Sequence, residues 1–171
     1  KDRAYVYFDS LTNQIETKIS AINKDVESIA NIISYSQSIQ KYLLEEDSLK
    51  RFRVFEFVQD NLNYTLSSNS NIQSIKIIGR DFGSFKSSSD DKLQVYYQIN
   101  KEYDLEDYNI SNPFYTRIYT DKPINKLFYA YITPIYSFLR QPFERSPAAI
   151  CIILCKLDLV QNLIDSVSMP P

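Results

Sequence analysis

The stretch Ile15-Glu-Thr-Lys-Ile-Ser-Ala-Ile-Asn-Lys-Asp-Val-Glu-Ser-Ile-Ala-Asn-Ile-Ile33 places an apolar residue at every third or fourth position. This spacing puts the apolar side chains on one face of a helix. The pattern begins near Phe8 and continues to Ile39 and Leu43, so it predicts a single helix of about 35 residues, which would be about 50 Å long. A rod of this length exceeds a small domain and suits a protein that carries a signal along its own length. The apolar stripe comprises Ile15, Ile19, Ile22, Val26, Ile29 and Ile33.

A second helix is predicted after the polar interruption at residues 45–48. Asp47 or Ser48 is a suitable N-cap because a short polar side chain there accepts a hydrogen bond from a free backbone N–H. The Ser- and Asn-rich cluster at residues 67–71 ends this helix. Its apolar residues again recur at steps of three and four: Leu49, Phe52, Phe55, Val58, Leu62 and Leu66.

The second half of the chain predicts an antiparallel sheet of about five strands. Ala148–Leu157 is apolar on both faces, so we expect it at the centre of the sheet. Pro134 has no N–H to donate and is expected at an edge or a bulge. Between the strands, Asn112 and Pro113 predict a short helix that ends near Tyr119. The predicted strands are Ile72–Ile78, Phe85–Ser87, Val95–Gln98, Leu127–Tyr136 and Ala148–Leu157.

Helices followed by strands and a closing helix indicate an α+β domain. We expect one domain over residues 1–171. In this interpretation residues 1–70 form a helical stalk and the second helix, and residues 71–158 form the sheet. Residues 159–171 form a short C-terminal helix, with Asp158 as a candidate N-cap.

Composition argues against catalysis and against metal or cofactor binding. The chain has no His and only two Gly, so it lacks the commonest general base and a glycine-rich phosphate loop. Two Cys without His partners do not make a zinc site, and no acidic cluster has the spacing of a calcium loop. We therefore expect no catalytic residue, no metal and no cofactor.

Charge and cysteine spacing exclude two further features. Nineteen basic and 21 acidic residues give a net charge of −2, which argues against a nucleic-acid partner. Cys151 and Cys155 are four strand residues apart, or about 13 Å. A disulfide requires Cα atoms within about 7 Å, so we expect two buried free thiols.

The chain has no apolar run near the roughly 18 residues of a membrane span. The longest clear run, Ala148–Cys155, has eight residues, and the chain begins at Lys1 without Met. We therefore expect an excised fragment whose membrane segments lie outside it.

Three segments carry a resemblance to a known family. The first is Ile29–Leu44, which contains Ser-Tyr-Ser-Gln-Ser-Ile-Gln-Lys-Tyr-Leu, and the second is Asn71-Ile-Gln-Ser-Ile-Lys-Ile-Ile followed by Asp81-Phe-Gly. The third is Ile132-Thr-Pro-Ile-Tyr136 with the later Leu157-Asp-Leu159. In this order they resemble the extracellular Cache domain, a PAS-like sensor of bacterial transmembrane receptors. The family's usual Gly at the start of the last strand is replaced by Ala148 and Ala149.

The resemblance is closest to the sensor region of histidine kinases that work with AraC-type response regulators. It implies an extracellular, non-catalytic domain that binds a small molecule on its sheet. Its long first helix would emerge from the membrane and its last helix would lead back to it. The N-terminal helix could also pair two copies into a homodimer.

Tyrosines concentrate where a ligand site is expected. Nine of the fourteen Tyr lie between Tyr96 and Tyr136, and Tyr combines an apolar ring with a polar hydroxyl. In amino-acid-binding Cache domains an Arg and nearby aromatic residues hold the ligand carboxylate, and Arg117 with Tyr115 is similar to that arrangement. Tyr129 and Tyr131 share one strand face. The candidate binding residues are Tyr97, Tyr115, Arg117, Tyr129 and Tyr131.

Two alternatives remain open. The tyrosines could simply pack the sheet, in which case the domain is a structural or interaction module without a ligand. The same sensor could also belong to a chemoreceptor, a cyclase or a membrane transcription regulator. An internal pocket would favour the sensor, and a sheet filled by its own aromatic side chains would favour the module.

Overall fold

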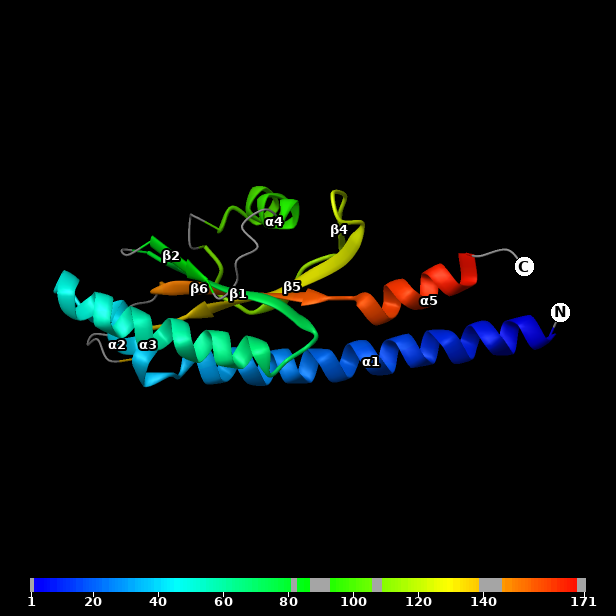
Figure 1. Cartoon of the computed structure of the whole chain (residues 1–171), viewed down its shortest axis with the longest axis horizontal. Coiled ribbons are helices and arrows are strands. Elements are labelled where there is room, and N and C mark those ends of the chain that lie inside the picture. Colours follow the sequence, from blue (N-terminus) through cyan, green and yellow to red (C-terminus); the bar gives the residue numbers. More distant parts are fainter. Residues whose placement is uncertain (1, 81–82, 87–92, 106–108, 139–145, 169–171) are drawn as a thin grey trace.

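The computed structural model describes residues 2–80, 83–86, 93–105, 109–138 and 146–168. Three helices cover one face of an antiparallel sheet, and a shorter helix lies on the other face (Figure 1). The predicted α+β class is confirmed. The predicted loop at residues 88–92 and most of the turn between Ser137 and Pro147 lie outside the described residues.

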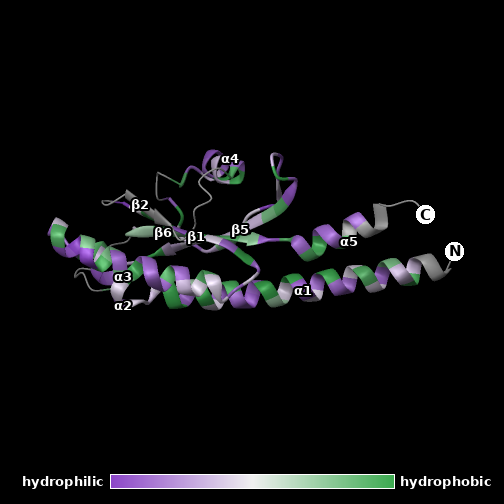
Figure 2. Cartoon of the chain, viewed as in Figure 1, coloured by the Kyte–Doolittle hydropathy of each residue, from purple (hydrophilic) through white to green (hydrophobic). Residues whose placement is uncertain are grey.

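The first helix, α1, spans Asp2–Ser34. Apolar and polar bands alternate along the coloured part of α1 (Figure 2), as expected for a helix with one apolar and one polar face. Val26, Ile29 and Ile33 are buried in the core against the sheet. The N-terminal third extends beyond the sheet (Figure 1) and leaves Tyr5 and Phe8 exposed.

The prediction of one helix to Leu43 is wrong, because the chain breaks at Tyr35 and Ser36 before α2 (Gln37–Leu44). The fully buried Gln40 side chain accounts for the break. Its Nε2 donates to the backbone oxygens of Ser34 (3.0 Å) and Tyr136 (2.9 Å). The backbone oxygen of Ser34, the last residue of α1, therefore accepts from a side chain and not from a backbone N–H of a further helical turn.

The next helix, α3, spans Ser48–Ser67 and confirms the second predicted helix. Asp47 is its N-cap, because a carboxylate oxygen accepts from the backbone N–H groups of Leu49 and Lys50, both at 3.0 Å. Val58 and Leu62 bury the inner face of α3 in the core that it shares with α1 and α2.

The sheet has the order β2-β1-β6-β5-β3, with β4 pairing to the same edge of β5 as a sixth strand. All pairings are antiparallel. Strand β6 lies between β1 and β5 and is buried on both faces, as predicted. Among the described strands, only β6 pairs with β5 at Pro134, so Pro134 lies on a free edge. The bounds are β1 Ile72–Gly79, β2 Gly83–Lys86, β3 Phe114–Tyr115, β4 Tyr119–Asp121, β5 Lys126–Ile135 and β6 Ala149–Lys156.

Two local predictions are wrong. The segment Val95–Gln98 is not a strand but part of helix α4 (Gln94–Tyr103), in which Val95 and Ile99, one turn apart, are both fully buried. The segment after Asn112 is not a helix but the short strands β3 and β4. The edge of β5 supplies the backbone hydrogen bonds that hold this segment extended.

The final helix, α5, spans Asp158–Ser168 and packs beside β5. Cys151 and Cys155 are free and buried, as predicted, and burial raises the pKa of each thiol to about 12. Within the described ranges, no helix combines the length and the apolarity that a membrane crossing requires.

Candidate functional site

Three of the five predicted site residues lie together on the α1 side of the sheet. Tyr129 and Tyr131 project from the same face of β5, and Tyr115 of β3 lies opposite Tyr131 in the strand register. The Tyr115 ring is 4.7 Å from the Tyr131 ring and 6.1 Å from the Tyr129 ring, centroid to centroid. These distances are in the range of favourable aromatic contact.

The tyrosine hydroxyls bind the sheet to α1. Tyr115 donates to a carboxylate oxygen of Glu27 (2.8 Å) and lies 3.1 Å from the Asn23 backbone oxygen. Tyr129 donates to Asn23 Oδ1 at 2.8 Å. A displacement of α1 along its axis would therefore break these bonds.

A cavity of about 220 Å³ lies beside this cluster, between α1 and the sheet. The side-chain Nδ2 of Asn23 donates to none of the described residues, so it is available to an acceptor. Ile118 lines the cavity with 51% of its surface exposed, which puts it where the cavity opens to solvent. Leu157 is the residue immediately before α5. The cavity is lined by Ile19, Asn23, Tyr115, Thr116, Ile118, Tyr129 and Leu157.

The tyrosines of this cluster remain neutral at physiological pH. Burial raises the pKa of Tyr115, and the neighbouring Glu27 carboxylate raises it further. Burial likewise raises the pKa of Tyr129 and of Tyr131. All three side chains therefore offer hydroxyl groups and not phenolates.

Arg117 does not join Tyr115. The chain turns between β3 and β4 so that Arg117 faces α4, where its Nη2 lies 2.9 Å and its Nε 3.0 Å from Glu102 Oε2. Tyr119 donates to the same carboxylate oxygen at 2.9 Å, and the guanidinium lies over the Tyr119 ring. Hydrogen bonding to Arg117 lowers the pKa of Glu102, and the same bond raises the pKa of Arg117.

Tyr97 is also separate from the cluster. It lies on α4 with 72% of its surface exposed. Sequence reasoning missed Asn23 and Glu27, which contact the tyrosines from α1. Both flank the apolar stripe of α1, where polar residues usually face solvent, so nothing in the pattern distinguished them. Among the residues that the structure places, no group of three His, Cys, Asp or Glu side chains is suited to holding a metal ion.

No protein-family model and no curated protein matches this chain. Its fold is similar to that of solved sensory domains. The extracellular domain of vpHK1S-Z8, assigned as a histidine kinase, gives a TM-score of 0.57 at 11% identity, over 88% of this chain and 58% of that one. The sensory domain of the Campylobacter jejuni chemoreceptor Tlp3, solved with isoleucine bound, gives 0.57 at 15% identity, over 96% and 65%.

The ligand-binding domain of the Pseudomonas aeruginosa PAO1 amino acid chemoreceptor PctC, solved in complex with GABA, gives a TM-score of 0.50 at 14% identity, over 92% of this chain and 65% of that one. This chain thus spans less than two thirds of the length of each of these structures. At such identities the similarity establishes the fold alone. The chain therefore has the fold of the sensory domains of a histidine kinase and of chemoreceptors.

Proposed function

We propose that this chain is the extracellular ligand-sensing domain of a membrane-bound receptor, a sensor histidine kinase of the kind that works with AraC-type response regulators. The fold shared with sensory domains supports the sensor role. The resemblance of the sequence to Cache domains of such kinases supports the type of receptor. The domain itself is non-catalytic in this proposal, and the output activity belongs to the rest of the receptor.

The main support for the proposal is that the cavity lies next to both terminal helices. Ile19 and Asn23 line it from α1, and Leu157 lines it from the junction of β6 and α5. Both terminal helices extend from the sheet towards the same end of the molecule (Figure 1). A molecule in this cavity therefore touches both terminal helices or their junctions. If the terminal helices have two arrangements and the ligand binds one of them more tightly, binding shifts the population towards that arrangement.

The lining favours a small polar ligand with a short apolar body. A cavity of about 220 Å³ is below the roughly 300–1,000 Å³ of sites for drug-sized molecules. Asn23 Nδ2 supplies a donor for a carbonyl or carboxylate, and Tyr115 and Tyr129 supply flat walls. Tyr131 does not line the cavity, and its ring lies 4.7 Å from the Tyr115 ring, centroid to centroid. Arg117 and Tyr97 are not assigned to this cavity, because they lie with α4.

A chemoreceptor is the second candidate for the parent protein, since the fold is equally similar to the chemoreceptor domain of Campylobacter jejuni Tlp3. In either receptor, α1 is the element we expect to pair two copies. Its N-terminal third carries exposed Tyr5, Val6, Tyr7 and Phe8, and a second α1 would cover those that share one helix face, such as Tyr5 and Phe8.

A screen of amino acids and small carboxylates by thermal shift tests the ligand site. Ile118→Trp fills the cavity mouth from a side chain that is 51% exposed. Ile124→Trp is the matched control, because Ile124 is 48% exposed and does not line the cavity. A ligand at 100 times its Kd stabilises the fold by about 2.7 kcal/mol.

We expect at least one compound to raise the Tm of the wild type and of Ile124→Trp but not of Ile118→Trp. A compound that stabilises Ile118→Trp as much as the wild type contradicts this cavity as the site. If no compound in the screen stabilises the chain, the result favours a structural or interaction module. That outcome would fit the hydroxyls of Tyr115 and Tyr129, which already have partners on α1.

A further inference from the structure

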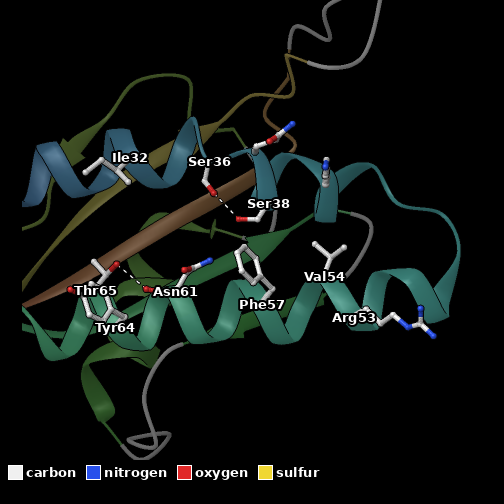
Figure 3. Close-up of a pocket in the computed structure, with 11 residues that line it drawn as sticks. Ile32, Ser36, Ser38, Arg53, Val54, Phe57, Asn61, Tyr64 and Thr65 are labelled. Atoms are coloured by element: carbon white, nitrogen blue, oxygen red, sulfur yellow. Dashed lines mark hydrogen bonds between the residues drawn. The ribbon is translucent and has the colours of Figure 1, made fainter.

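A second hollow is lined by residues of α3 and of the junction of α1 with α2. These elements meet at the end of the molecule away from both termini (Figure 1). The hollow is a groove of about 660 Å³ between α3 and that junction. Figure 3 shows Val54 and Phe57 pointing from α3 towards α2, with Phe57 next to Ser38 and Ser36 beside Ser38. The groove follows α3 from Arg53 to Thr65, a length of about 18 Å at 1.5 Å per residue.

The apolar side chains of this groove are unusually open to solvent. Ile32, Phe57 and Tyr64 line it, and each exposes more than half of its surface. Sites for small molecules bury most of the ligand within a concave wall, which side chains this exposed cannot do. Exposed apolar surface of this kind is typical of protein contacts, and a shallow groove beside a helix suits a docked amphipathic helix.

The charges of the groove specify the occupant further. Lys41 from α2 and Arg53 from α3 are its charged lining residues, and no Asp or Glu lines it. Neither cation forms an ion pair with any described residue in the structure. The polar remainder, which includes Ser36, Ser38 and Asn61, offers hydrogen bonds without a compensating negative charge. The surface is therefore complementary to an apolar segment that carries carboxylates.

We propose that this groove docks an acidic amphipathic helix of a partner protein. About three helical turns span its length. Apolar residues at positions i, i+4 and i+7 of the partner pack on Ile32, Phe57 and Val54, in the order in which these side chains follow one another in Figure 3, and an Asp or Glu at the Val54 end pairs with Arg53 and Lys41. The proposal is independent of a ligand in the cavity at Asn23, because the groove shares no lining residue with that cavity.

Peptides selected from a random display library on the intact chain test this proposal, with Kd values measured by fluorescence anisotropy. Phe57→Ser removes the apolar centre of the groove, and Arg53→Glu reverses its charge. The matched controls are on the same helix: Phe52→Ser, since Phe52 is 60% and Phe57 61% exposed, and Lys50→Glu. Neither control residue lines the groove.

We expect the selected peptides to be acidic and amphipathic, and to weaken at least tenfold on Phe57→Ser and on Arg53→Glu. The controls and Ile118→Trp should bind within twofold of the wild type, and added salt should weaken binding. Selected peptides without acidic bias, or peptides that bind Phe57→Ser as tightly as the wild type, overturn the proposal. A selection that yields no binding peptide also overturns it. A small-molecule site is shown instead if hexanoate or indole-3-acetate raises the Tm of the wild type but not of Phe57→Ser while no peptide binds, and this result overturns the proposal as well.

Discussion

Asn23 is the residue through which α1 contacts the tyrosine cluster. Its side-chain oxygen accepts from Tyr129, its backbone oxygen lies 3.1 Å from the Tyr115 hydroxyl, and the residue lines the cavity. One residue thus connects the helix, two strands and the candidate ligand. A ligand that draws Asn23 towards itself competes with the hydrogen bond from Tyr129.

Removing the Tyr129 hydroxyl should weaken this connection measurably. Tyr129→Phe deletes the bond to Asn23 Oδ1, so we expect the free energy of unfolding to fall by about 1 kcal/mol. Urea denaturation measures this loss. Tyr97→Phe is the control, because the exposed Tyr97 should lose almost nothing. Equal losses in both variants would contradict the role of the Asn23 bond.

The ion pair between Glu102 and Arg117 should give a pH-dependent contribution to stability. Since the pKa of Glu102 is lowered in the fold from 4.5, the contribution is present above about pH 4.5 and is lost as the pH falls through the folded pKa. Glu102→Gln should therefore be less stable than the wild type near neutral pH.

The stability difference between wild type and Glu102→Gln should shrink as the pH falls below about 4.5, because a protonated Glu resembles Gln. Thermal unfolding from pH 7 to pH 3 measures it. Glu16→Gln, on the exposed face of α1, is the control for replacing a Glu by Gln in this chain. A constant difference between wild type and Glu102→Gln across this range would refute the ion-pair account.

At the scale of elements, the break between α1 and α2 depends on Gln40. Its side chain is fully buried, and it bonds three backbone groups, since Oε1 also accepts from the N–H of Phe138 at 3.3 Å. It thereby fixes α2 to the end of β5. The bend places α2 against α3 and creates the groove described above.

Gln40→Leu should destabilise the fold because it keeps the volume but leaves buried backbone groups without partners. We expect a loss of about 2–3 kcal/mol in the free energy of unfolding. Gln14→Leu on the exposed side of α1 should change it by less than about 0.5 kcal/mol. A Gln40→Leu variant as stable as the wild type would mean that packing alone sets the bend.

The elements with strong periodicity were predictable, and those that depend on partners were not. The stripe of α1, the N-cap at Asp47 and the doubly apolar β6 follow from local pattern, and all three are present. The segment after Asn112 is held extended by the edge of β5, which no local pattern reveals. The break at Ser36 likewise depends on Gln40 and a strand about a hundred residues later.

The candidate site was predictable only where strand alternation applies. Tyr129 and Tyr131 share a face because they are two residues apart on one strand, and the structure places Tyr115 with them. Arg117 was expected beside Tyr115 only from the resemblance to amino-acid-binding Cache domains, since the sequence pattern predicted a helix there. The chain leaves strand β3 after Tyr115 and turns Arg117 towards α4.

For the whole molecule, the two terminal helices are the parts that a sensor must move. Both extend to the same end (Figure 1), and the cavity is lined by residues of α1 and by Leu157, immediately before α5. If the chain is a sensor, a ligand there changes the position of α1 relative to α5. If it is a structural module, that arrangement is fixed.

The most direct test is the distance between α1 and α5, measured by double electron–electron resonance with spin labels at Glu16→Cys and Asn162→Cys. Both positions are exposed, and the native Cys151 and Cys155 are buried. The account predicts that the compound with the largest thermal shift changes the distance distribution, and that Ile118→Trp abolishes the change. An identical distribution with and without saturating compound would contradict the claim that this domain senses a ligand through its terminal helices.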